Sequence, residues 1–439
     1  MKKLIKKLIW YDKLYNLIKT SFIYQWRKKI NGQIANTING NPSKDFFIVW
    51  VTGTNWKTTT ANMLHKMFNE LLAPTVMVST ACIKIWDKTT VNDKKMTSLD
   101  AYQLQWLLAD AKWQWCKVAI LETSSHWLDQ HRFEWITFDY AILTNVTQDH
   151  LDYHKNMNNY AKAKKKLFKY VLRNEKETKY ATFPADDKIG RERFEEMAFD
   201  KKINFSIQNS SMLKAENIVE WVNKTSFDIK YLWNTYPTKC EILWAYNIYN
   251  YLSALSVWIQ IWLDINKCIS SLSSFTGVSG RMEKIVHNGV TYFVDFAHSP
   301  DALEKTLQFL QTLKGNGRLI LVFGAPGNRD KTKRPNMWKI WWGYTDIAIA
   351  TDDDPDTENR LSIIKQLTQE IDIANNNGKK LFIIPERQLA IKFATEIARP
   401  GDIVMLAGKW HEPIQRTNFW TRKRSDKDEL LKSLNTILN

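Results

Sequence analysis

The sequence predicts an α/β protein, with a central domain on a mostly parallel sheet and a smaller second α/β domain. Two observations predict this class. Short apolar runs alternate with helical patterns from residue 47 onward, which is typical of strands joined by crossover helices. The segment FTGVSGR, residues 275–281, interrupts the alternation with two glycines, as expected of a hinge. We therefore expect a basic segment at 1–46, a central domain at 47–280 and a C-terminal domain at 281–439.

The N-terminal segment is basic and amphipathic. The 439-residue chain has a net charge of +16, and its first 30 residues hold nine Lys or Arg against Asp12 alone. One helical face carries the apolar residues Leu4, Leu8, Tyr11, Tyr15, Ile18 and Phe22. Such a helix either lies on an anionic membrane or docks on its own protein, and the sequence leaves both readings open. No motif for DNA or RNA accompanies the charge, so we expect no nucleic-acid partner.

The chain also lacks the marks of an exported protein. Its four cysteines lie far apart, and no Cys/His spacing indicates a zinc site or a disulfide framework. No apolar run reaches the roughly 18 residues of a membrane span. Lys6 and Lys7 interrupt any signal-peptide core. We expect a cytoplasmic protein, with peripheral contact at the inner face of the membrane through residues 1–30 as the alternative.

Each expected strand is a short apolar run. In the central domain these runs are FFIVWV (46–51), TVMVST (75–80), KVAILE (117–122), DYAILTN (139–145) and KINFS (202–206). In the second domain they are VTYFVDF (290–296), RLILVFG (318–324), DIAIAT (346–351), KLFIIP (380–385) and DIVMLAG (402–408). Polar residues directly follow most of these runs. Because ligands of parallel α/β sheets gather at the carboxyl ends of strands, we expect the chemistry there.

The first run leads into WVTGTNWKTTT, residues 50–60, which has the layout of a phosphate-binding loop. Such a loop needs backbone N–H groups aimed at the anion, a lysine, and a Ser or Thr for magnesium. Lys57 and Thr58 meet the last two needs, but Val51 and Trp56 stand where the strict pattern has glycine. An indole at residue 56 would fill the phosphate's space and strain a left-handed backbone. As written, the loop is broken.

The tryptophan content suggests why. The chain has only 15 glycines but 20 tryptophans, and together they make about 8% of the residues. That sum is close to the usual glycine share of about 7%. We therefore interpret many written tryptophans as glycines, which is the pattern left when a stop codon reassigned to glycine is translated as Trp. A truly Trp-rich protein is the alternative.

Longer motifs follow the loop in a fixed order. They are ILETSSHWLDQHRF (120–133), TNVTQDHLDYHKNMNNYAKAKKKLF (144–168), WAYNIYN (244–250), GVSGRME (277–283), VDFAHSPDALE (294–304), VFGAPGNRDKTKRPNM (322–337) and GKWHE (408–412). With Trp56 read as glycine the loop becomes GTNGKTT. The chain after residue 47 then resembles the Mur ligases, and within them the UDP-N-acetylmuramoyl-tripeptide synthetases. Nine tryptophans stand where that family usually has glycine: residues 50, 56, 127, 135, 244, 258, 262, 338 and 410.

The resemblance implies an ATP-dependent, ADP-forming amide ligase that uses Mg²⁺, with a P-loop ATPase-like central domain and a Rossmann-like C-terminal domain. It implies four catalytic residues, Lys57, Glu122, His150 and Lys164, and a carbamate formed on Lys164 from CO2. The implied magnesium ligands are Thr58, Glu122, His150 and Lys164. The implied ATP contacts are Thr54, Asn55, Lys57, Thr58, Thr59, Asn247, Asn250, Arg281, Asp295 and His298. Pro184, in TFPADD, replaces an asparagine of the family and puts one adenine-side contact in question.

The resemblance also implies two acceptor sites. The muramoyl-peptide substrate would contact Thr97, Ser124, Gln130 and Arg132, and the free amino acid would contact Arg329, Asp353, Asp354, Asp356 and Glu412. Diaminopimelate-adding relatives carry Arg in the place of Asp356. An aspartate there would repel a distal carboxylate and attract an ammonium, so we expect lysine or another basic diamino acid. The simpler reading is that Asp356 faces solvent.

We therefore predict a ligase that adds a diamino acid to a muramoyl-dipeptide cell-wall precursor. One alternative is a related ligase acting on another acid, such as a glutamyl-chain or cyanophycin-like ligase. Another is a non-catalytic membrane-binding homologue, which requires a genuine Trp56. The family normally has an N-terminal domain that holds the uridine diphosphate, whereas only about 46 residues precede the first expected strand here. This departure predicts a substrate held differently, for example one linked to membrane lipid.

Overall fold

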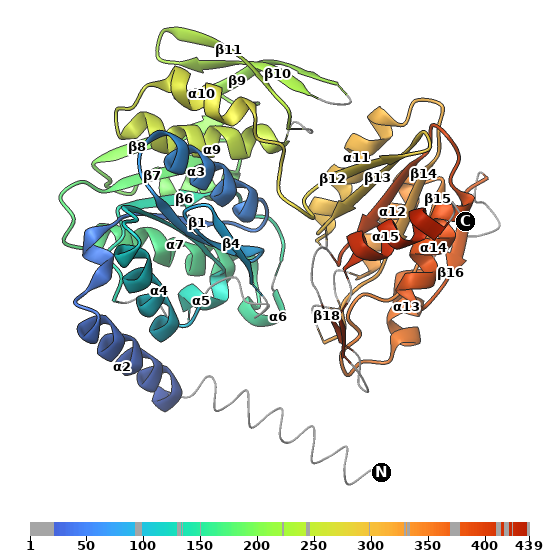
Figure 1. Cartoon of the computed structure of the whole chain (residues 1–439), viewed down its shortest axis with the longest axis horizontal. Helices are drawn as coiled ribbons and strands as arrows, with labels where there is room; N and C mark the ends of the chain where they lie inside the picture. The colour runs from blue at the N-terminus through green and yellow to red at the C-terminus, as the bar shows by residue number, and fades with distance from the viewer. Residues whose placement is uncertain are drawn as a thin grey trace.

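The structure is a computed structural model that describes residues 22–92, 99–129, 133, 135–149, 151–221, 224–242, 246–297, 299–328, 331, 334–368, 378–409, 414–416, 421–423 and 425–436. Two α/β lobes lie side by side, joined by a single segment that passes from the larger lobe to the smaller one (Figure 1). Each lobe is built on its own sheet. The predicted fold class is therefore confirmed.

The larger lobe holds an eleven-stranded sheet in the order β11-β10-β9-β8-β7-β6-β1-β5-β2-β3-β4. Its strands are β1 (Phe47–Thr52), β2 (Thr75–Val78), β3 (Cys82–Ile85), β4 (Lys88–Val91), β5 (Val118–Thr123), β6 (Tyr140–Leu143), β7 (Tyr180–Pro184), β8 (Lys201–Ser206), β9 (Leu213–Glu220), β10 (Thr225–Tyr231) and β11 (Asn234–Cys240). The central strands from β9 to β2 pair in parallel, and both ends of the sheet are antiparallel. In the register of β1 and β5, Val51 lies beside Glu122. The loop after β1 thus starts next to that carboxylate.

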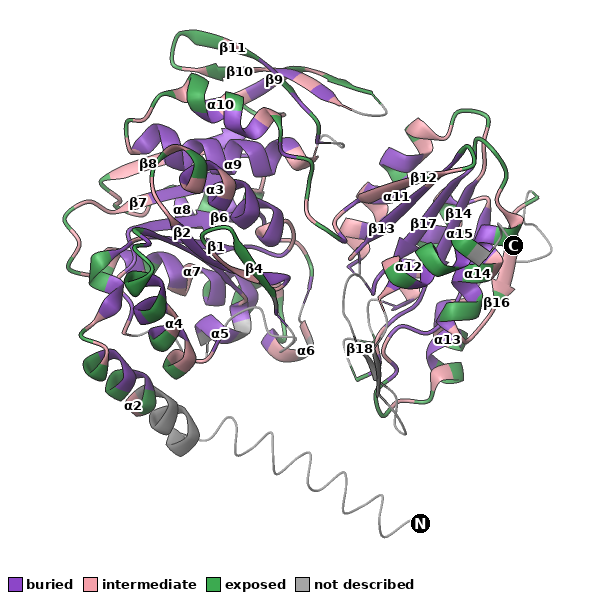
Figure 2. Cartoon of the chain, viewed as in Figure 1, coloured by how far each residue is buried: buried purple, intermediate pink, exposed green. Residues whose placement is uncertain are grey.

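Helices cover both faces of the larger sheet. They are α2 (Phe22–Ile38), the 3-10 helix η1 (Pro42–Asp45), α3 (Lys57–Leu71), α4 (Ala101–Trp113), α5 (Ser125–Asp129), α6 (Leu151–His154), α7 (Met157–Arg173), α8 (Lys188–Phe194), α9 (Tyr246–Gln260) and α10 (Ile265–Ser273). One core joins a sheet face to α3, α9 and α10 through residues such as Leu64, Leu252 and Cys268. The other core joins the opposite face to α4 and α7 through Leu104 and Leu167. Figure 2 shows the central strands of the sheet, such as β1, β2 and β6, buried between these layers.

The smaller lobe repeats this layered plan. Its six-stranded sheet has the order β12-β13-β17-β14-β15-β16. The strands are β12 (Glu283–His287), β13 (Val290–Asp295), β14 (Leu319–Phe323), β15 (Ile347–Ala350), β16 (Lys380–Ile383) and β17 (Ile403–Ala407), with a separate hairpin of β18 (Ile414–Arg416) and β19 (Thr421–Lys423). The helices are α11 (Pro300–Leu313), α12 (Arg334–Tyr344), α13 (Arg360–Thr368), α14 (Arg387–Ile397) and α15 (Asp426–Thr436). The apolar residues of α11, α12 and α13 cover one sheet face, and those of α14 and α15 cover the other.

All ten predicted strands are present, as β1, β2, β5, β6, β8 and β13 to β17. The sequence analysis missed β3, β4, β7, β9 to β12, β18 and β19. Most of these strands lie at the antiparallel margins, where one face meets solvent and polar residues interrupt the apolar pattern. The sequence KAENIVE in β9, for example, is mostly half-buried or exposed. Such strands lack the continuous apolar run by which the buried parallel strands were found.

Helix α2 docks on the larger lobe. It packs against α4, and Ala35 is fully buried. A Cβ added to Gly32 would lie 2.8 Å from the Cβ of Ala101, so the two helices approach too closely for any side chain there. Gly32 and Ala35 of this helix therefore pack on their own protein. The predicted stripe from Leu4 to Ile18 lies outside the described residues.

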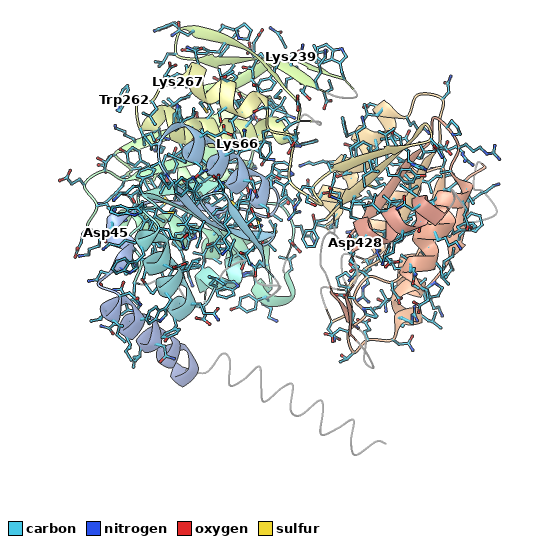
Figure 3. The ribbon with its side chains drawn as sticks, in the orientation of Figure 1. Asp45, Lys66, Lys239, Trp262, Lys267 and Asp428 are labelled. Carbon is cyan, nitrogen blue, oxygen red and sulfur yellow. The ribbon has the colours of Figure 1, made fainter. Side chains whose placement is uncertain are left out.

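Among the described residues, four tryptophans have a left-handed backbone conformation that favours glycine: Trp56, Trp86, Trp115 and Trp262, with φ of 71°, 54°, 65° and 61°. Two of them end helices in the same way. The N–H of Trp262 bonds to the carbonyl of Ile259 while that of Leu263 bonds to Trp258, and Trp115 and Cys116 repeat the pattern after α4. This is the Schellman ending, whose left-handed position is usually glycine. Trp262 is 81% exposed and lies at the edge of the molecule (Figure 3). Backbone geometry thus supports the glycine interpretation at Trp262 and extends it to Trp86 and Trp115.

Candidate functional site

The candidate site begins at the loop between β1 and α3, residues 53–56. A Cβ on Gly53 would lie 1.7 Å from the hydroxyl oxygen of Thr144, so only glycine fits. The side-chain oxygen of Asn145 accepts hydrogen bonds from the backbone N–H groups of Thr54 and Asn55, at 3.0 and 2.8 Å. The carboxyl end of β6 therefore holds the loop in place. This is the expected position for a ligand site at the carboxyl ends of parallel strands.

Lys57 opens α3 and folds back over this loop. Its Nζ donates to the carbonyl oxygens of Gly53 at 3.0 Å and Thr54 at 2.8 Å. Burial lowers the pKa of the Lys57 ammonium, while the carboxylates of Glu122 and Asp149 oppose that shift. A cation held at a helix N-terminus, with loop carbonyls as its partners, is placed to exchange those partners for phosphate oxygens.

Trp56 occupies the mouth of the loop. Its indole stacks on Tyr249 of α9, with ring centroids 5.7 Å apart and planes at 11°, and Lys305 of α11 lies 5.2 Å from its centroid. The cavity lined by Trp56, Asn247 and Arg281 measures only about 40 Å³. A nucleotide needs several hundred Å³. With tryptophan at residue 56, the site does not fit ATP.

A glycine at residue 56 would open this cavity. The indole would no longer fill the space between the loop and α9, and the left-handed φ of 71° would be unstrained. The neighbouring cavity beside the hinge measures about 330 Å³ and shares Asn247, Arg281 and Met282 with the smaller one. The two together reach the size of a nucleotide site.

Oxygen donors suited to magnesium lie beside the loop. The Glu122 carboxylate accepts the hydroxyl of Thr58 at 3.0 Å, and both the N–H and the hydroxyl of Thr80, at 2.9 and 2.8 Å. Arg281 donates to the Thr58 hydroxyl at 3.3 Å. Hydroxyl and carboxylate oxygens are the ligands that Mg²⁺ prefers, so Thr58 and Glu122 together fit the ion. Within the described residues no three His, Cys, Asp or Glu side chains gather as a metal-binding group.

Lys164 is buried on α7, with only 1% of the residue exposed. Burial and the charge of Lys57 hold the pKa of its amine well below the usual value, against the opposing charges of Asp149 and Asp187. This shift favours the neutral amine, which is the form that attacks CO2. The neighbouring Lys162 is exposed. The structure thus distinguishes Lys164 from the lysines around it.

The hinge and the second lobe close the site from the other side. Asn250 is buried and bonds to the hydroxyl of Thr60 at 3.0 Å and to Asn247 at 2.9 Å. Asn247, Arg281 and Asp295 line the small cavity together with Asn55 and Thr59. Across the gap the side-chain amide of Asn55 donates to the carboxylate of Asp301 at 3.2 Å. The predicted ATP contacts described in the structure therefore converge at the junction of the lobes.

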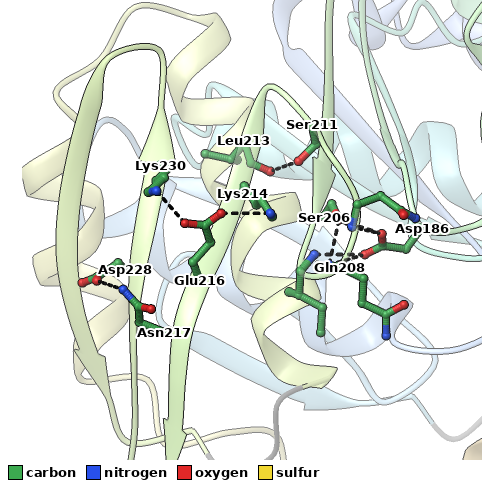
Figure 4. A network of polar contacts seen from close by, with 12 residues as sticks. Asp186, Ser206, Gln208, Ser211, Leu213, Lys214, Glu216, Asn217, Asp228 and Lys230 are labelled. Carbon is green, nitrogen blue, oxygen red and sulfur yellow. Dashed lines mark hydrogen bonds and ion pairs between the residues drawn. The ribbon is translucent and has the colours of Figure 1, made fainter.

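Pro184 ends β7, and two residues later Asp186 holds neighbouring groups in place by hydrogen bonds. The Asp186 carboxylate accepts the hydroxyl of Ser206 at 2.6 Å and the N–H groups of three residues after β8 (Figure 4). It also accepts the hydroxyl of Tyr249 at 2.7 Å. These donors hold the pKa of Asp186 below its usual value despite its partial burial. Asp186 therefore orients Tyr249, whose ring faces residue 56.

The predicted amino-acid residues lie in the second lobe. Asp353 is buried, and Asp354 pairs with the buried Lys409 at 2.6 Å. Asp356 is exposed, has φ of 52°, and accepts a hydrogen bond from Asn328 at 3.2 Å. Ser124, predicted to contact the muramoyl peptide, is half-buried directly before α5. The other predicted residues lie outside the described residues: Thr97, Gln130, Arg132, His150, His298, Arg329 and Glu412.

The sequence analysis missed three residues that shape the site: Thr80, Asn145 and Tyr160. Thr80 and Asn145 follow β2 and β6, so their position at strand ends was a usable signal. The sequence gives a weaker signal for Tyr160. Its place four residues before Lys164 puts both side chains on one face of a helix, which matters only once Lys164 is known to be buried.

Comparisons with known proteins agree with this arrangement. The family model of the Mur ligase middle domain matches residues 51–258, and that of the Mur ligase, glutamate ligase domain matches residues 280–410. A protein of Clostridium acetobutylicum named UDP-N-acetylmuramoyl-L-alanyl-D-glutamate--2,6-diaminopimelate ligase 1 is 36% identical over 378 residues, which cover 85% of this chain and 75% of that protein. The chain belongs to the Mur ligase family. Members of this family are ATP- and Mg²⁺-dependent, ADP-forming amide ligases.

Further relatives support the assignment. A Mur ligase of a Roseiflexus species, named UDP-N-acetylmuramyl-tripeptide synthetase, is 33% identical over 390 residues, covering 86% of this chain and 76% of that protein. A solved UDP-N-acetylmuramoyl-L-alanyl-D-glutamate--2,6-diaminopimelate ligase superposes with a TM-score of 0.64 at 28% identity, over 93% of this chain and 83% of that one. The folylpolyglutamate synthase of Mycobacterium tuberculosis, solved with ADP and AMPPCP, shares the fold with a TM-score of 0.71 at 16% identity, over 87% and 92% of the two chains. None of the described helices of our chain is both long and apolar enough to cross a membrane.

Proposed function

We propose that this Mur ligase, with glycine at residue 56, adds a diamino acid to a muramoyl-dipeptide precursor of the cell wall. The proposal rests on one arrangement: Lys57 lies close enough to Glu122, Lys164 and Arg281 for their charges to interact. Arg281 and Asp295 line the adjoining cavity. The relatives named for muramoyl-peptide substrates, at 36% and 33% identity, supply the substrate class. A glutamyl-chain ligase is the second candidate.

The residues have distinct parts in the proposed reaction. ATP supplies the phosphoryl group that turns the substrate carboxylate into an acyl phosphate, and Mg²⁺ neutralises phosphate charge. Lys57 and Arg281 are half-buried cations that would stabilise developing negative charge in the site. Thr58 and Glu122 supply metal ligands, and Lys164, after reaction with CO2, supplies carbamate oxygens. His150 is the remaining proposed ligand.

We propose that the boundary between the two ligase domains lies at residues 280–281. Arg281 then belongs to the hinge side of the second domain while it donates to Thr58 of the first. Closing the hinge would bring the amino-acid site toward the acyl phosphate, as in other enzymes that close over substrate.

The two acceptor sites use separate sets of residues. The muramoyl peptide would be held by Thr97, Ser124, Gln130 and Arg132. The α-amino acid would be held by Arg329 and Glu412.

The proposed amino acid is lysine or another diamino acid without a distal carboxylate. Asp356 is exposed and its carboxylate is held by Asn328, so it presents negative charge where the diaminopimelate enzymes are expected to present arginine. A distal ammonium would be attracted there and a carboxylate repelled. Diaminopimelate, which names the Clostridium relative, is the competing candidate.

ADP release and ATP binding test the activity. The chain should be prepared as written and as the Trp56→Gly variant, with Trp262→Gly as a control far from the site. We expect ATP binding and substrate-dependent ADP release only where residue 56 is glycine. ATP binding by the chain that keeps Trp56 would refute the blocked-loop argument. Binding without ADP release on any muramoyl dipeptide would refute the ligase proposal.

Competition assays test the amino acid. Lysine, ornithine and diaminopimelate should be compared as acceptors, each against the same muramoyl dipeptide. We expect lysine or ornithine to be preferred, and Asp356→Arg to shift preference toward diaminopimelate. Asp228→Arg, at a half-buried acid in β10 of the other lobe, serves as the matched control. A clear preference of the unmodified enzyme for diaminopimelate would overturn the assignment.

We also propose peripheral membrane contact through residues 1–30. Their nine basic residues against one acid would favour an anionic surface by electrostatics. Co-sedimentation with vesicles that contain anionic lipid, compared with neutral vesicles, tests it. Equal binding to both kinds of vesicle, or to neither, would exclude the electrostatic contact.

A further inference from the structure

Tyr160 lies between the phosphate loop and Lys164, and nothing above gives it a part in the reaction. It belongs to α7 and is only 1% exposed. The amine of Lys164 lies 4.4 Å from the centroid of its ring. The two residues are one helical turn apart, so the ring forms a wall that limits where the buried lysine side chain can point.

The hydroxyl of Tyr160 reaches the phosphate loop. Its oxygen lies 3.1 Å from the hydroxyl oxygen of Thr54. The Thr54 hydroxyl donates to the carbonyl of Thr147 at 3.1 Å and accepts the N–H of Thr147 at 3.0 Å. A threonine hydroxyl has one hydrogen and two lone pairs. Its hydrogen is already used, so the Tyr160 hydroxyl donates to Thr54, and all the bonding capacity of Thr54 is engaged.

Tyr160 also packs against His154. The ring of His154 lies 5.2 Å from that of Tyr160, and its Nε2 lies 2.9 Å from the hydroxyl of Ser125. Ser125 opens α5 directly after Ser124. One buried side chain therefore contacts the loop proposed to bind ATP and the lysine proposed to carry the carbamate, and it packs against the histidine that supports α5.

We infer that Tyr160 is a positioning residue for the ligase reaction. Its ring fixes the Lys164 amine for attack on CO2, and its hydroxyl fixes the phosphate loop through Thr54. In the carbamate step the nitrogen lone pair of Lys164 forms a bond to the CO2 carbon, and one proton leaves the nitrogen for solvent. The inference rests on the proposed function. It is testable without turnover, because ATP binding and carbamate formation are each measured directly.

Two substitutions separate the two contacts. Tyr160→Phe keeps the ring and removes the hydroxyl, whereas Tyr160→Leu removes both. Tyr170→Phe is the matched control, since Tyr170 is on the same helix but its ring packs toward Trp50. In the full chain with glycine at residue 56, calorimetry gives the dissociation constant for ATP. The carbon-13 NMR signal of the carbamate, recorded over a series of labelled bicarbonate concentrations, gives carbamate occupancy.

We expect Tyr160→Phe to weaken ATP binding roughly three- to tenfold, the worth of one buried hydrogen bond, with the carbamate signal unchanged. We expect Tyr160→Leu to weaken ATP binding similarly and also to need about tenfold more bicarbonate for the same carbamate signal. Variants that match Tyr170→Phe in both measurements would overturn the inference. The inference would also be overturned if the Tyr160 variants lost thermal stability but bound ATP and bicarbonate as tightly as the unmodified enzyme does. If the changes in ATP binding and in bicarbonate requirement appear but the enzyme releases no ADP, the result counts against the proposed function and not against the positioning role of Tyr160.

Discussion

The indole of Trp56 lies nearly parallel to the ring of Tyr249, and so fills the space in front of the phosphate loop. Tyr249 is itself fixed, because its hydroxyl donates to Asp186 at 2.7 Å. Neither partner of this stack can move aside without breaking a buried contact. A single residue type at position 56 therefore decides whether this ligase seats a nucleotide.

The first prediction concerns the residues that the natural protein carries. Peptide mass spectrometry of the protein from its native source should find glycine at positions 56, 86, 115 and 262, where φ is positive. The physical reason is that a bulky side chain costs roughly 1–2 kcal/mol in this backbone region, whereas glycine costs nothing there. Tryptophan in the peptides covering residues 115 and 262 would contradict the reading that backbone geometry identifies the misread positions.

The second prediction concerns Lys164 and CO2. Lys164→Met should lower ADP release by about a hundredfold or more, because a charged group that stabilises the metal and phosphates is lost. Lys162→Met, at an exposed lysine two residues away, should leave it unchanged. The unmodified enzyme, assayed in CO2-free buffer, should regain activity when bicarbonate is added. Activity independent of bicarbonate would show that the amine works without a carbamate.

The site could be predicted from the sequence where its residues follow buried parallel strands. Glu122 is the next-to-last residue of β5 and the phosphate loop follows β1, so an apolar run and the polar residues at its end located both. Thr80 and Tyr160 were missed because their parts depend on which loops meet in space. The burial of Lys164 could not be predicted either: four lysines crowd residues 162–166, and only the packing of α7 shows which one faces inward.

The third prediction concerns the stability of the second lobe. Arg387 of α14 pairs with Asp426 of α15 at 2.6 Å, both side chains are 3% exposed, and Arg387 also donates to the carbonyls of Asp352 and Ala407. Asp426→Ala should lower the free energy of unfolding by about 3–5 kcal/mol, because it leaves a buried guanidinium uncompensated. Glu396→Ala, which breaks the exposed pair with Lys392, should cost at most about 0.5 kcal/mol. Urea unfolding curves measure both, and equal losses would show that burial is not what distinguishes the two pairs.

The last prediction concerns acid sensitivity. Burial lowers the pKa of His65, on α3, from 6.5 to about 4, and the charge of Lys84 contributes. Above pH 6.5 the imidazole is neutral in both the folded and unfolded chains, so it adds no pH dependence. Between pH 6.5 and 4 the unfolded chain binds a proton that the folded chain refuses, so stability falls as pH falls, by up to about 3 kcal/mol. Urea unfolding of the unmodified chain and of His65→Gln, at pH 7 and pH 5, measures this term as the difference between their pH dependences. Identical pH dependence in the two chains would show that His65 takes up its proton without unfolding.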